Sequence, residues 1–97
     1  MKKTSAETIV LREERTDEFF LYIYELIHRE GRQTADWRLP LYSVRISLTD
    51  KYGKTCTKEA VDIFTDKERA VSFFDRLVRN LATPIDLGYV VEDEIRI

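Results

Sequence analysis

The chain has few of the residues that cross-link a fold, bind metals or interrupt regular structure. Its 97 residues include one cysteine (Cys56), one histidine (His28), three glycines and two prolines. One cysteine excludes an internal disulfide and favours a reducing compartment, and one cysteine with one histidine cannot supply the clustered ligands of a zinc site. We therefore expect no metal, no cofactor and a cytoplasmic location.

Long apolar runs and a dominant charge are also missing. No segment approaches the roughly 20 apolar residues that cross a bilayer, and the two lysines near the start are not followed by the apolar stretch of a secretion signal. The chain is 43% hydrophobic and 35% charged with a net charge of −2, which excludes a disordered chain and a strongly basic nucleic-acid binder. These numbers predict one globular domain over residues 1–97, with residues 1–6 as a flexible N-terminus.

The clearest element that is present is a helix from Asp66 to Ala82. Thr65 and Glu68 have the spacing of a capping box, in which each side chain bonds the other residue's amide. Apolar residues recur at helical spacing and make one stripe: Ala70, Phe74, Leu77 and Leu81. Phe74 and Leu77 are predicted to lie at the centre of the core.

A second, shorter helix is predicted from Pro84 to Asp93. Thr83 is a suitable cap, and proline is favoured at the first helical position because its missing N–H would be unpaired there. The apolar residues expected to pack from this helix are Ile85, Leu87, Val90 and Val91. Gly88 weakens the helix.

A hairpin precedes the helices. Residues 42–49 alternate apolar and polar side chains, which is the pattern of a strand with one wet face. Asp50 to Gly53 supplies a tight turn in which Gly53 takes a positive φ, and a return strand follows from Lys54 to Ile63.

The first third of the chain predicts two more strands, Thr8 to Glu14 and Phe19 to His28. The second also fits helical spacing, with Gly31 as a possible end, but its crowded aromatic and β-branched residues favour a strand. Residues 30–39 form a polar loop. The element order predicts an α+β fold: a four-stranded antiparallel meander with one long and one short helix on one face.

Two chemical roles can be considered for the polar residues, and the sequence supports each of them less than a structural role. Cys56 and His28 are the one possible Cys–His pair for nucleophilic catalysis, but nothing in the sequence brings them together. A basic, aromatic-bearing loop could stack a base beside a phosphate contact: Arg29, Arg32, Trp37 and Arg38. We expect the protein not to be an enzyme, and keep nucleic-acid binding as the alternative function and a Cys–His enzyme as a distant one.

If residues 19–24 form a strand, both faces of that strand are apolar. A sheet covered by helices on one side needs apolar side chains on that face only. The second face must meet a loop, a helix or another chain, and tyrosine is favoured at interfaces. We therefore predict a non-catalytic protein-interaction or regulatory module that self-associates, most simply as a symmetric homodimer, with no membrane partner. The predicted interface residues are Phe19, Phe20, Leu21, Tyr22, Ile23, Tyr24 and Trp37.

The second half of the chain resembles a family of small uncharacterised proteins, a domain of unknown function, from clostridial and related Gram-positive bacteria. The likeness is carried by residues 42–46, 61–63, 83–87 and 90–93. Asp86 stands where the family usually has a histidine, so no role of that histidine is carried over. The resemblance implies a bacterial, cytoplasmic protein of mixed fold and supplies no activity.

Overall fold

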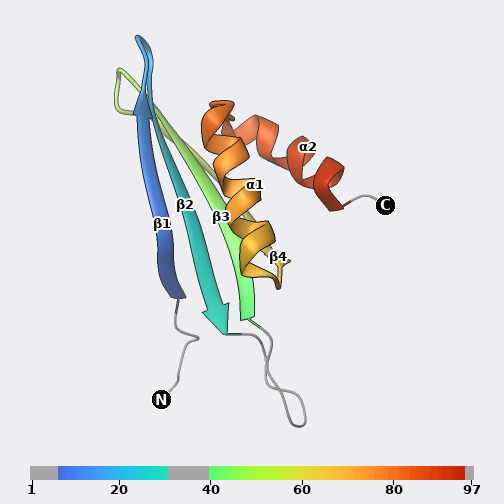
Figure 1. Cartoon of the computed structure of the whole chain (residues 1–97). Coiled ribbons are helices and arrows are strands. Elements are labelled where there is room, and N and C mark those ends of the chain that lie inside the picture. The colour runs from blue at the N-terminus through green and yellow to red at the C-terminus, as the bar shows by residue number, and fades with distance from the viewer. Residues whose placement is uncertain (1–6, 31–39, 96–97) are drawn as a thin grey trace, which may run out of the picture.

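Four antiparallel strands and two helices form the structure, a computed structural model that describes residues 7–30 and 40–95 (Figure 1). The sheet is a meander in the order β1-β2-β3-β4, and both helices lie on one of its faces, which confirms the predicted α+β fold. The elements are β1 (Glu7–Thr16), β2 (Phe20–Glu30), β3 (Pro40–Asp50), β4 (Thr55–Phe64), α1 (Lys67–Arg79) and α2 (Pro84–Ile95).

The ambiguous segment after residue 18 is a strand, as predicted, and it begins at Phe20. Alternation sends every second side chain of β2 toward the helices, where Tyr22, Tyr24 and Leu26 are buried. Each of them faces an apolar residue of β3, for example Tyr24 opposite Ile46. One face of β2 therefore has intramolecular cover, and this face holds the centre of the core.

The β3–β4 turn has the predicted geometry. Gly53 has φ of 86°, a conformation that side chains with a Cβ rarely adopt. The Asp50 carboxylate accepts hydrogen bonds from the amides of Tyr52 (2.9 Å) and Lys54 (3.0 Å). The turn therefore requires glycine at position 53 and is stabilised by the hydrogen bonds of the Asp50 side chain.

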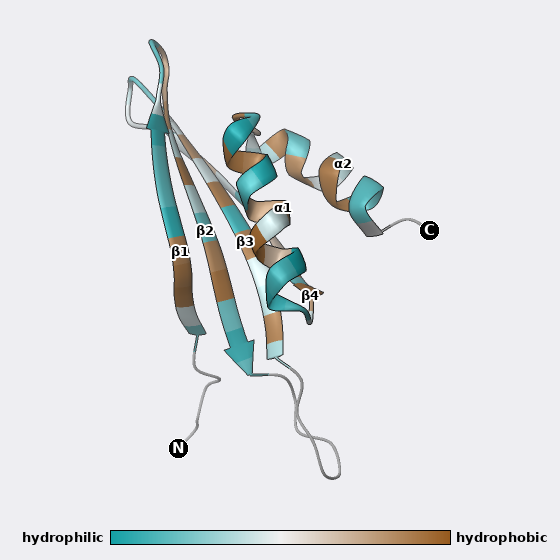
Figure 2. Ribbon diagram, viewed as in Figure 1, coloured by the Kyte–Doolittle hydropathy of each residue, from teal (hydrophilic) through white to brown (hydrophobic). Residues whose placement is uncertain are grey.

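Helix α1 begins at Lys67, one residue later than predicted, and ends at Arg79, three residues before the predicted end at Ala82. The capping residue is Asp66, not Thr65, and its carboxylate accepts the Glu68 amide at 3.2 Å. A carboxylate at this position satisfies a free N–H and also favours the positive end of the helix dipole. Of the predicted stripe, Ala70, Phe74 and Leu77 are buried against the sheet with Phe73 beside them, whereas Leu81 lies beyond the end of α1 and is only partly buried. In Figure 2 the outer surface of α1 is mostly hydrophilic.

The connection between the helices is fixed by backbone hydrogen bonds. Leu81 has φ of 53° and donates to the Val78 carbonyl (3.1 Å), while Ala82 donates to the Leu77 carbonyl (3.0 Å). This is a Schellman end in which leucine occupies the position that usually holds glycine.

The capping box predicted for the long helix occurs instead at the start of α2. The Thr83 amide donates to the Asp86 carboxylate (3.0 Å), and the Asp86 amide donates to the Thr83 hydroxyl (3.3 Å). Thr83 as the cap and Pro84 as the first helical residue are confirmed. The helix runs two residues beyond its predicted end at Asp93.

One buried hydrogen bond joins the sheet to this connection. The Tyr24 hydroxyl donates to the Ala82 carbonyl at 2.8 Å. Burial raises the pKa of Tyr24 to about 12, so the hydroxyl remains protonated where an exposed tyrosine ionises.

We predict that Gly53→Val destabilises the fold by about 1–3 kcal/mol, since a β-branched residue is strained at positive φ. Thermal or urea unfolding measures the effect. Lys51→Val in the same exposed turn is the control and should change stability little. An unaltered melting temperature for the Gly53 variant would contradict the turn geometry.

Phe74→Ala should cost about 3–5 kcal/mol, because it leaves a cavity among α1, β2 and β3. Asp75→Ala, at the neighbouring exposed position, should stay within about 0.5 kcal/mol. Urea denaturation compares the two. A loss below 1 kcal/mol for the phenylalanine variant would place the stripe at the surface.

Tyr24→Phe should cost about 1–3 kcal/mol at neutral pH, because the buried Ala82 carbonyl loses its donor. The raised folded-state pKa means that the unfolded chain loses this proton first as pH rises. The advantage of the wild type over Tyr24→Phe should therefore shrink between pH 10 and pH 12. Unfolding at pH 7 and pH 11 tests this, with Tyr52→Phe as the exposed control.

Candidate functional site

Strand β4 is an edge of the sheet, so only one side of its backbone pairs with β3. The Asp50 amide donates to the Lys54 carbonyl at 2.9 Å, and antiparallel ladders alternate between bonded and non-bonded pairs. Asp50 and Lys54 are thus a bonded pair, and along β4 every second residue from Lys54 bonds to β3. The residues between them, Thr55, Thr57 and Glu59, direct their N–H and C=O groups away from β3.

A bulge ends this regular edge. Asp62 has φ of 56°, its amide donates to the Ser43 hydroxyl (2.8 Å), and its carboxylate accepts from Arg29 (2.7 Å). The hydrogen bond to Asp62 raises the pKa of Arg29. Bulges twist edge strands away from further pairing, so the stretch able to accept another strand is residues 55–59.

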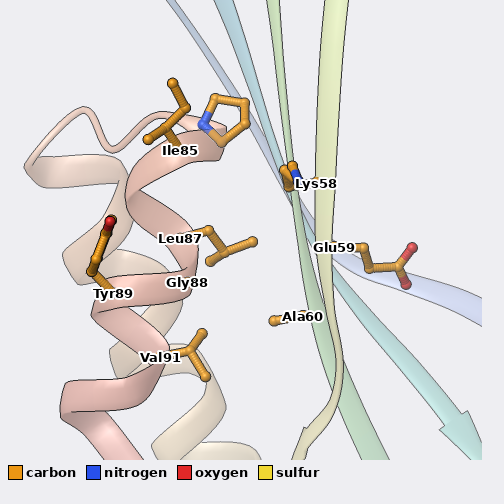
Figure 3. Close-up of a pocket in the computed structure, with 9 residues that line it drawn as sticks. Lys58, Glu59, Ala60, Ile85, Leu87, Gly88, Tyr89 and Val91 are labelled. Atoms are coloured by element: carbon orange, nitrogen blue, oxygen red, sulfur yellow. The ribbon is translucent and has the colours of Figure 1, made fainter.

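Helix α2 runs along this edge and encloses a groove with it (Figure 3). Its volume is about 480 Å³. The residues that line this edge groove are Lys58, Glu59, Ala60, Pro84, Ile85, Leu87, Gly88, Tyr89 and Val91.

The floor and the rim of the edge groove differ in exposure. Leu87 and Val91 point from α2 toward β4 near Ala60, and Leu87 is buried (Figure 3). On the outer surface of α2, Ile85 is 75% exposed and Tyr89 is 68% exposed. The prediction that Ile85 packs in the core was wrong, because the helix turns that residue outward.

Gly88 lies between these two exposed residues. It is in the interior of a helix, where glycine costs about 0.5–1 kcal/mol relative to alanine. Among residues 7–30 and 40–95, a Cβ built at this position meets nothing within 4 Å, so no contact with that part of the chain requires glycine here.

Ion pairs hold the far end of α2 in place. Glu94 accepts hydrogen bonds from Arg69 and Arg76 of α1, and the Arg76 bond holds the pKa of its carboxyl below the usual value. The edge groove is thus framed by a strand on one side and a clamped helix on the other.

The sheet face without helices is crossed by charged side chains. Arg45 of β3 donates to Glu25 of β2 at 2.8 Å and lies 3.6 Å from Glu59 of β4. The Glu25 hydrogen bond raises the pKa of Arg45. Ile27 is almost completely buried on this face, opposite Ser43. The charged middle of this face has the pattern of an antiparallel sheet with one face toward water, whereas Ile27 and Ser43 are buried on the same face.

The predicted interface residues that the structure describes separate into three groups. Tyr22 and Tyr24 are core residues beneath the helices, and Leu21 and Ile23 are partly buried on the charged face. Phe19 (57% exposed) and Phe20 (37% exposed) form an aromatic corner at the β1–β2 turn, where the Asp17 carboxylate accepts both of their amides. Trp37 lies outside the described residues.

The candidate catalytic pair is not brought together. Cys56 aligns with Leu48 and Tyr22, whereas His28 lies six residues further along β2, about 20 Å away at strand spacing. His28 packs against Tyr42 (ring centroids 5.1 Å apart), and Cys56 is exposed.

The candidate nucleic-acid loop lies largely beyond the described ranges. Arg32, Trp37 and Arg38 fall within residues 31–39, and Arg29 is paired with Asp62. Over residues 7–30 and 40–95, no group of three or more His, Cys, Asp or Glu side chains could hold a metal ion. No helix in the same ranges is both long and apolar enough to span a membrane.

Sequence reasoning missed the edge groove. The available signal was that Ile85, Gly88 and Tyr89 recur at helical spacing on a side of the helix that Leu87 and Val91 do not share. Periodicity alone does not tell which of two apolar sides meets the sheet.

Comparison with protein families shows where the chain belongs. A model described as a family of unknown function, DUF6514, matches residues 2–96, so the chain belongs to that family. This confirms the predicted membership of a family of unknown function and extends it to the first 40 residues. No curated protein and no solved structure matches the chain.

Gly88→Ala should stabilise the isolated chain by about 0.5–1 kcal/mol, because it removes the entropic cost of glycine and meets no neighbour. Urea unfolding at a low protein concentration measures it. Gly53→Ala, at positive φ, is the contrasting variant and should be destabilising. A lower free energy of unfolding for Gly88→Ala would show that a Cβ at this position does meet a neighbouring group.

Proposed function

We propose that this member of the DUF6514 family is a non-catalytic protein-interaction module that self-associates. The observation that carries the proposal is the outer edge of β4, which pairs with no strand of the described part of the chain. This edge lies beside the edge groove, with Ile85 and Tyr89 exposed on the rim. An open strand edge next to a helix is the receiving half of β-strand addition, in which backbone bonds supply affinity and adjacent pockets accept side chains.

The aromatic corner supports the same function as a second contact surface. Phe19 and Phe20 are exposed, and Leu21 and Ile23 are only partly covered. These four residues and Trp37 are the part of the predicted interface that we retain as proposed contacts. Tyr22 and Tyr24 contribute by supporting the fold beneath.

The test is the molecular mass in solution as a function of concentration, by analytical ultracentrifugation. We expect a monomer–dimer equilibrium at micromolar concentrations. Tyr89→Ser should weaken it at least tenfold, because an exposed ring loses its apolar contact. Arg79→Ser, an exposed residue on the outside of α1, is the control. A wild type that remains monomeric at high micromolar concentration would contradict self-association.

Phe19→Ser separates the two surfaces in the same experiment. It should weaken dimerisation if the aromatic corner takes part and leave it unchanged if the edge groove acts alone.

The alternative function, nucleic-acid binding through Arg29, Arg32, Trp37 and Arg38, has less support because Arg29 is already paired with Asp62. Its signature would be retention on heparin that falls with salt and is lost on substituting Arg32 and Arg38.

A further inference from the structure

We propose that a second copy of this chain binds antiparallel along β4, with a two-fold axis through Thr57. The two sheets then form one continuous eight-stranded sheet. This inference rests on the proposed self-association and names its partner, surface and register.

The backbone restricts the possible registers. Over residues 54–60, the residues that direct their N–H and C=O groups outward are Thr55, Thr57 and Glu59, so these residues must bond one another across the junction. A two-fold axis perpendicular to the sheet also places the helix-bearing faces of both copies on the same side of the joined sheet. Axes through residues 55 to 59 are therefore the ones to compare.

Charge selects among them. An axis through Lys58 opposes two ammonium groups, and one through Glu59 opposes two carboxylates. An axis through Cys56 places Lys54 opposite Lys58. Like charges directly opposite are destabilising, whereas an axis through Thr57 opposes none in this stretch.

The axis through Thr57 also pairs all three of the outward-pointing residues. Thr57 lies opposite its own copy, and Thr55 lies opposite Glu59 at both ends of the junction. An axis through Thr55 would run the second strand into the turn at Gly53. The Thr57 register is thus the one that joins all three outward residues without a charge conflict.

The other edge of the sheet is unsuited to this contact. Residues 12–15 of β1 are Arg-Glu-Glu-Arg, so an axis through any of them opposes like charges. The upper half of β1 is correspondingly hydrophilic in Figure 2. Charged edges of this kind prevent strand pairing.

The same register gives the edge groove an occupant. Lys58 lies opposite Cys56 of the second copy, and Ala60 lies opposite its Lys54. All four side chains are on the helix-bearing face, since they alternate with Thr57 and Glu59. The second copy's Cys56 and the aliphatic part of its Lys54 therefore enter the groove beside Gly88, where the missing Cβ leaves room.

Disulfide trapping tests the register. In a Cys56→Ser background, Thr57→Cys should oxidise to a covalent dimer, because directly opposite bonded residues have Cα atoms about 5.5 Å apart, within disulfide range. Thr55→Cys, on the same strand and face, is the matched control. It lies four residues from its own copy, about 13 Å, and should not cross-link. Equal cross-linking of both variants would overturn the Thr57 axis.

Proline substitution tests the edge itself. Thr57→Pro removes an outward N–H that does not pair with β3, so the fold should persist while dimerisation weakens at least tenfold. Thr16→Pro removes an outward N–H from β1 and should leave dimerisation unchanged. Circular dichroism verifies folding, and ultracentrifugation gives the dissociation constant.

The outcomes separate the two proposals. A monomeric wild type would reject self-association and this inference together. A dimeric wild type that persists in Thr57→Pro would reject the β4 contact while self-association stands.

Discussion

The hydrogen bond from Tyr24 to the Ala82 carbonyl is the constraint on which the arrangement of this protein depends. It joins the centre of the sheet to the short connection between the helices, across 58 residues of sequence. The connection begins with Leu81 in a left-handed conformation and ends with the Thr83–Asp86 capping box. Fixing Ala82 therefore fixes the end of one helix and the start of the next, and α2 is directed along β4 instead of across the sheet.

The position of α2 determines which surfaces remain for contact. Its floor residues cover part of β4, and Glu94 holds its far end to α1 through Arg69 and Arg76. On the outward side of α2, Ile85 and Tyr89 are exposed. The helix-free face of the sheet differs in kind, because Arg45 links Glu25 and Glu59 across three strands in a way suited to water.

Most of the fold was predictable from local chemistry. The β3–β4 turn, the strand nature of residues 20–28 and the stripe around Phe74 each follow from residues close together in sequence. The cap of α1 was misplaced by one residue because Thr65 and Asp66 are both good caps. The apolar character of residues 19–24 predicted two covered faces, but the position of their cover depends on helices that lie 40 or more residues later. The edge groove is likewise a product of long-range packing, which no local pattern contains.

The Asp62 bulge and the charges of β1 have a consequence for how an assembly would grow. Sheets with two open edges can add copies without limit and become fibres. Here one edge can pair over a single short stretch before the backbone turns aside, and the opposite edge carries four consecutive charges. A pair joined at β4 would have the two charged β1 strands at the borders of its sheet, so strand pairing by itself would stop at two chains.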